Sequence, residues 1–119
     1  MSKSKLAAGA AVLAVGLGGV ATTAVSAAPK ATYKLSADKS KLKFNKSTIR
    51  AKAGKVTLSM SNPSSLPHNV GVKGKGVGKT VNKGGTSKYS VTLKKGTYTF
   101  YCGVGSHEKA GMKGKLIVS

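Results

Sequence analysis

Polar and apolar residues alternate along most of the chain, with the period of two that is typical of β-strands with one buried face. The alternation is clearest in the segment 55–62, where Val56, Leu58 and Met60 fall on one face and hydroxyl residues fall on the other. This segment is therefore predicted to be a strand with one face in the core. Further strands are predicted at 33–35, 42–44, around Ile49, at 68–72, at 89–93, at 96–102 with Cys102 at its inward-facing end, and at 115–119.

Turn residues divide these apolar stretches. Gly, Asn, Pro or Lys-Gly turns recur about every eight to twelve residues, and no segment after residue 31 shows a clear helical period. The segment 71–85 is rich in Gly and Lys, so a long loop carrying one edge strand is expected there. The pattern predicts an all-β protein: a Greek-key β-sandwich or barrel of about seven to eight strands.

The first residues have a different composition from the rest. Lys3 and Lys5 precede an apolar run that extends from Leu6 to about Val25 and ends in small residues. This order is typical of a secretory signal peptide, and we predict that it comprises residues 1–27, leaving one domain at 28–119. An uncleaved membrane anchor is the alternative, since the run is long enough to span a bilayer. In either case the domain is expected outside the cytoplasm, in the periplasm, at the cell surface or secreted.

The charge of the chain is strongly positive. Its 119 residues include 21 Lys and Arg but only 2 Asp and Glu, giving a formal net charge of +19. Sequence-specific nucleic-acid binding is not expected, because outside the predicted signal peptide only Arg50 could make a forked contact with a base. The lysines have two possible explanations. They could form solvated faces of strands, or they could attract an acidic partner or an anionic cell envelope.

One segment near the C-terminus carries residues that bind soft metals. Cys102, His107 and Met112 follow one another at intervals of five residues. Each of them alone has an ordinary explanation, as a small buried side chain, a loop histidine or a residue that fills a gap. A thiolate, two imidazoles and a weak thioether are together the ligands of the trigonal copper sites used for electron transfer. The second imidazole must then come from His68, since the chain contains only 2 histidines.

These residues resemble the cupredoxin family of small blue copper proteins, which includes plastocyanin, azurin and halocyanin. The resemblance covers roughly 49–119, and it implies one copper ion held by His68, Cys102, His107 and Met112. It further implies that Asn69 ties the two ligand loops together by hydrogen bonding near the cysteine. The resemblance also implies that the edge of His107 reaches solvent through an apolar patch. The candidates for this patch are Leu66, Pro67, Val104, Ala110 and Gly111. The interval from Cys102 to His107 is longer than in plastocyanin.

The sequence is compatible with three functions. The first is an extracytoplasmic carrier of single electrons between redox proteins, a monomer whose lysines attract partners with acidic docking surfaces. The second is a copper-binding protein for storage, delivery or stress defence that has no redox partner. The third is a polycation that binds envelope polyanions and whose metal site is vestigial. An enzyme is not expected, because a pair of Cys102 and His107 would lack an orienting carboxylate and an oxyanion loop.

Overall fold

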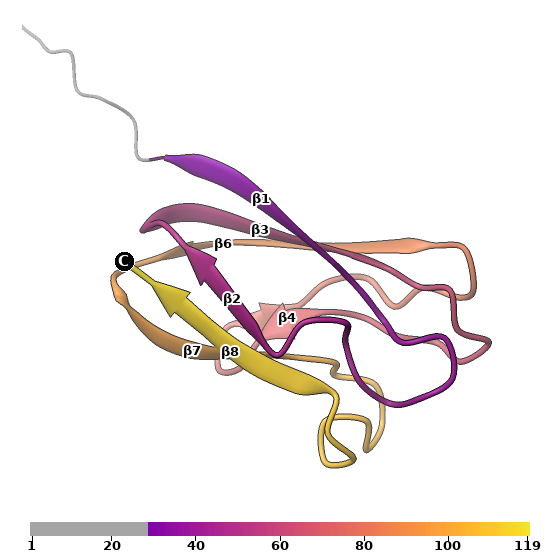
Figure 1. Cartoon of the computed structure of the whole chain (residues 1–119). Helices are drawn as coiled ribbons and strands as arrows, with labels where there is room; N and C mark the ends of the chain where they lie inside the picture. Colours follow the sequence, from indigo (N-terminus) through magenta and orange to yellow (C-terminus); the bar gives the residue numbers. More distant parts are fainter. Residues whose placement is uncertain (1–28) are drawn as a thin grey trace, which may run out of the picture.

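The computed structural model describes residues 29–119, and the predicted signal peptide therefore lies outside the described residues. These residues form eight strands in two packed sheets (Figure 1). Within this part of the chain there is no helix long and apolar enough to cross a membrane. The strands are β1 (Lys30–Ser36), β2 (Thr48–Ala51), β3 (Gly54–Ser61), β4 (Gly71–Val72), β5 (Gly76–Val77), β6 (Thr86–Leu93), β7 (Gly96–Tyr101) and β8 (Lys113–Val118).

Strands distant in sequence are neighbours in both sheets. The smaller sheet has the order β1-β3-β6, and the larger has the order β2-β8-β7-β4-β5. The β1–β3 and β2–β8 pairs are parallel, and the other pairs are antiparallel. The chain therefore crosses repeatedly between the two layers, which are visible above and below one another in Figure 1. The prediction of an all-β sandwich of seven to eight strands is confirmed.

The core lies between the layers, where the apolar side of each strand faces inward. In β3 the side chains of Val56, Leu58 and Met60 are fully buried, as their alternation predicts. Phe100 of β7 and Leu116 of β8 face them from the larger sheet and are also fully buried. Burying each such side chain stabilises the fold by roughly 1.5 to 3 kcal/mol, so this core fixes the strands that carry the site.

Two of the predicted strands are wrong or shortened. Residues 42–44 form no strand, because the Asp38 carboxylate accepts hydrogen bonds from the backbone of Ser40 and Lys41 and bends the chain there. Of that segment only Phe44 pairs, in an isolated bridge to Ala37. The segment 68–72 is a strand only at β4, and His68 makes an isolated bridge instead.

Candidate metal centre

The segment between β7 and β8 folds back on itself. Cys102 directly follows β7, and its N–H donates to the Met112 carbonyl at 3.1 Å. The N–H of Met112 donates to the His107 carbonyl at 3.0 Å, and the N–H of His107 donates to the Val104 carbonyl, also at 3.0 Å. This closed loop brings together three residues that lie five positions apart in the sequence.

His68 reaches the same end of the sandwich from the loop between β3 and β4. Its N–H and carbonyl are paired with the backbone of Val81 at 3.1 and 2.9 Å. Pro67, which precedes it, has no N–H to donate, and the pairing at His68 is an isolated bridge. The backbone from which the imidazole extends is thus held in place by this pairing.

Three donor atoms of these side chains converge. His68 Nδ1 lies 3.2 Å from His107 Nδ1, and Cys102 Sγ lies 3.9 and 3.6 Å from those two nitrogens. A circle through three atoms at these separations has a radius of about 2.1 Å, close to the bonds of about 2.0 Å to nitrogen and 2.3 Å to sulfur that divalent first-row metals form. One metal ion could therefore contact all three atoms, and the residues fit the group that the sequence implies.

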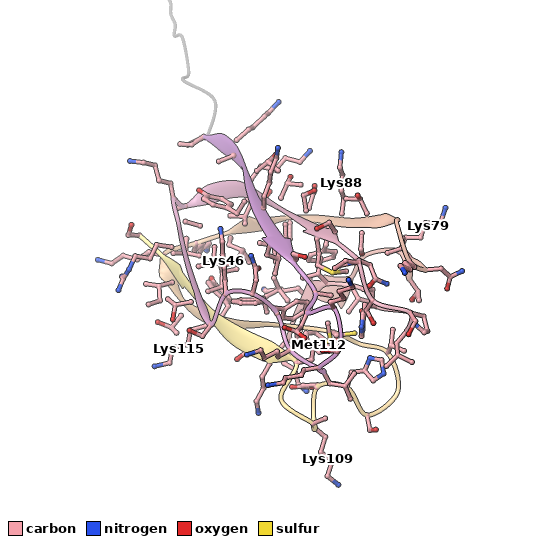
Figure 2. The ribbon with its side chains drawn as sticks, turned by 45° about the vertical axis from the view of Figure 1, so that its right-hand side comes forward. Lys46, Lys79, Lys88, Lys109, Met112 and Lys115 are labelled. Carbon is pink, nitrogen blue, oxygen red and sulfur yellow. The ribbon has the colours of Figure 1, made fainter. Side chains whose placement is uncertain are left out.

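Burial makes these donors suitable for a metal. Cys102, His68 and Met112 have no exposed surface, and His107 is partly exposed. Burial lowers the pKa of His68 below its usual 6.5, and repulsion by His107 lowers it further. His68 is consequently uncharged at neutral pH, the state in which imidazole binds metals. Figure 2 shows the side chains of Lys88 and Lys109 extending outward on opposite sides of the ribbon, whereas Met112 is fully buried.

All four predicted residues thus lie together at one end of the fold. Two imidazole nitrogens, one thiol sulfur and a buried thioether side chain form a cluster like a type 1 copper site. The family model of the cupredoxin-like domain matches residues 9–118. The chain is a cupredoxin.

Solved structures of two auracyanins and an amicyanin share its fold. Auracyanin A of Chloroflexus aurantiacus, a "blue" copper protein, matches with a TM-score of 0.68 at 22% identity over 76% of this chain and 100% of that chain. The auracyanin of Roseiflexus castenholzii matches with a TM-score of 0.67 at 22% identity over 74% of this chain and 96% of that chain. Amicyanin of Paracoccus versutus matches with a TM-score of 0.56 at 26% identity over 76% and 84% of the two chains.

Asn69 connects the two ligand loops of this cupredoxin, as the family resemblance implies. Its Oδ1 accepts a hydrogen bond of 2.6 Å from the N–H of Gly103, the residue after the cysteine. Its Nδ2 donates to Thr80 Oγ1 at 3.1 Å. The side chain therefore links the His68 loop to the Cys102 loop and orients both.

Two further contacts at the site were not predicted from the sequence. The fully buried side chain of Asn62 holds the loop before His68, and no motif marks it. Lys73 Nζ lies 2.5 Å from Glu108 Oε1 and 5.1 Å from the centre of the Tyr101 ring. This ion pair joins the turn after β4 to the ligand loop. Glu108 is one of only 2 acidic residues in the chain, and this scarcity is the signal that could have found the pair.

The lowered pKa of His68 predicts how the metal-free protein responds to acid. Its contribution to stability is fully present above about pH 6.5, the pKa of the unfolded chain, and declines as the pH falls toward the lower pKa of the folded state. We expect the thermal unfolding midpoint to fall between pH 7.5 and 5.5. A His68→Asn variant should lose most of this dependence. An unchanged or rising midpoint in the parent protein would contradict the assignment.

Proposed function

We propose that this cupredoxin is an exported blue copper protein that carries single electrons between redox partners. One copper ion would be held by His68, Cys102 and His107, with Met112 as a weak axial ligand. The observation that carries the proposal is the convergence of two Nδ1 atoms and one Sγ atom at separations of 3.2 to 3.9 Å. Copper supplies one-electron chemistry in such a site.

The protein's contribution is to hold the ligands still. The backbone of His68 is paired with that of Val81, and Cys102 and Met112 are joined by a backbone hydrogen bond. Asn69 links the two loops, so neither can move freely with respect to the other. Ligands that keep their positions allow electron gain and loss with little rearrangement, which favours fast transfer.

The His107 side chain could carry an electron from the metal to the surface of the protein. It is the only one of the four residues that is partly exposed, and Leu66 and Pro67 of the neighbouring loop are exposed as well. We infer that the predicted apolar patch around His107 receives the redox partner. An acidic partner would be attracted by the surrounding lysines.

The arrangement does not favour an enzyme. The carboxylate of Glu108, the acid next to His107, is paired with Lys73 and does not orient the imidazole. The thiol of Cys102 is fully buried, so a substrate could not reach it as a nucleophile. Export is supported by the signal-peptide pattern of residues 1–27.

A visible absorption spectrum tests the copper site. The purified protein with one equivalent of Cu(II) should show an intense band from thiolate-to-copper charge transfer, which bleaches with ascorbate and returns on oxidation. Rapid oxidation of the reduced protein by a c-type cytochrome would support electron carriage. A protein that gives up its copper readily to a chelator and exchanges no electrons would instead favour storage or delivery.

The axial position gives a separate prediction. Replacing Met112 with glutamine should leave copper bound but lower the reduction potential, because a harder axial oxygen favours Cu(II) over Cu(I). Protein-film voltammetry measures the shift. The matched control is Lys113→Gln, an exposed neighbour that should leave the potential nearly unchanged. A potential that rises in Met112→Gln would contradict axial ligation.

A further inference from the structure

The outward face of the smaller sheet has an unusual composition. The strand register places its outward side chains in four rows across β1, β3 and β6: Lys30, Lys55 and Thr92; Thr32, Thr57 and Ser90; Lys34, Ser59 and Lys88; and Ser36, Ser61 and Thr86. Every one of these side chains is a lysine or a hydroxyl. We call these twelve residues the lysine–hydroxyl face.

The geometry of this face follows from strand dimensions. The rows that contain lysine are four residues apart along β3, or about 13 Å, and a row of hydroxyls lies between them. In that row Thr57 Oγ1 and Ser90 Oγ lie 2.7 Å apart and are hydrogen-bonded. A shallow hollow of about 220 Å³ lies along the third and fourth rows. It is lined by Lys34, Ser59, Ser61 and Thr86 together with Leu35. The face is thus regular in its spacing, and its lysines are all exposed.

No negative charge opposes these lysines. In the part of the chain that the structure describes, the acidic residues are Asp38 and Glu108. Asp38 caps its own turn after β1, and Glu108 pairs with Lys73 beside the larger sheet. The outward face of the larger sheet differs, because Tyr101 and Ile117 stand among its basic residues. Positive charge without apolar side chains is therefore a property of the smaller sheet.

We propose that the lysine–hydroxyl face binds an anionic polysaccharide. Lysine ammonium groups would contact the carboxylates of the polymer, and the serine and threonine hydroxyls would exchange hydrogen bonds with its sugar hydroxyls. A protein partner is disfavoured, since stable protein interfaces depend on buried aromatic and apolar anchors that this face lacks. A bilayer is disfavoured because no apolar side chain on the face could enter it.

The binding face and the metal centre are separate surfaces. The metal residues lie in loops at one end of the sandwich, whereas the lysine–hydroxyl face covers the outside of one sheet (Figure 1). Polymer bound to the sheet would leave the partly exposed His107 free for a redox partner. The inference does not depend on copper binding or on electron transfer.

Two variants of equal charge test this proposal. The face variant carries Lys34→Gln, Lys55→Gln and Lys88→Gln, and the control variant carries Lys46→Gln, Lys109→Gln and Lys115→Gln. All six lysines are exposed, and Figure 2 shows Lys88 on the opposite side of the ribbon from Lys109 and Lys115. Binding to polygalacturonate, to neutral dextran and to phosphatidylglycerol vesicles is measured by biolayer interferometry at physiological salt. Thermal unfolding of each variant verifies that it is folded.

We expect the parent protein to bind polygalacturonate and not dextran. The face variant should bind about tenfold more weakly, since each lost contact has the strength of an exposed ion pair, while the control variant changes little. Equal weakening in the two variants would overturn the proposal, because net charge would then explain the binding. Binding to vesicles alone, to dextran as strongly as to polygalacturonate, or to none of the three probes would overturn it as well.

Discussion

Replacing Cys102 with serine is expected to abolish the intense visible absorption of the copper-loaded protein. The band requires a thiolate bound to copper, and Cys102 is the only cysteine in the chain. A serine hydroxyl stays protonated near neutral pH and is a poor ligand for copper. Its Oγ would stand where Sγ now lies 3.6 and 3.9 Å from the two histidine nitrogens.

The Cys102→Ser variant should also bind copper more weakly than the parent protein. Removal of a direct ligand should weaken binding by at least about 100-fold, the upper end of the effect known for groups that only support a ligand. Competition with a chelator of known affinity measures the loss. The matched control is Ser106→Ala, an exposed change in the same loop that should keep both colour and affinity. Colour that persists in a folded Cys102→Ser variant would remove the basis of the proposed site.

Replacing Asn62 with alanine is expected to cause a large loss of stability near the site. The side chain is 1% exposed, and its Nδ2 donates to the carbonyls of Leu66 and Val81 at 2.8 and 2.9 Å. Its Oδ1 accepts from the N–H of Ser64 at 2.9 Å. Alanine would leave the Leu66 carbonyl and the Ser64 N–H without these partners, while the Val81 carbonyl would keep its bond from the His68 N–H, so the free energy of unfolding should fall by about 2 kcal/mol or more.

The Asn62→Ala change should also disturb the metal centre. Val81 is paired with His68 through the backbone, so a loosened loop would let the imidazole move away from Cys102. We expect weaker copper binding together with a lower midpoint in urea unfolding. Asn82→Ala is the matched control, because Asn82 is exposed and should be replaceable at little cost. Equal stability of the two variants would contradict the role assigned to Asn62.

The core strands could be predicted from the sequence because burial imposes a period of two. In β3 the alternation is unbroken, and the predicted strand 55–62 differs from the observed one by one residue at each end. The segment 42–44 has the same alternation but forms no strand. Just before it, the carboxylate of Asp38 accepts hydrogen bonds from the backbone N–H groups of Ser40 and Lys41. Such side-chain bonds compete with strand pairing, and the pattern of hydrophobic residues does not reveal them.

The metal residues could be predicted because their chemistry is specific. Cys102, His107 and Met112 are near in sequence, and His68 followed from the count of histidines. The contacts that position them were harder to predict, since they depend on which loops meet. Asn69 is identified only by the family resemblance, and nothing in the order of residues distinguishes the buried Asn62 from the exposed Asn82.

The complete burial of Cys102 has a consequence for the protein before it acquires any metal. Thiol–disulfide exchange requires an attacking thiolate to reach the sulfur, and the Cys102 side chain has no exposed surface. A newly folded copy in an oxidising compartment is therefore protected from being cross-linked to another copy or capped by a small thiol. Burial inside the sandwich thus slows oxidation of the Cys102 sulfur in the metal-free protein.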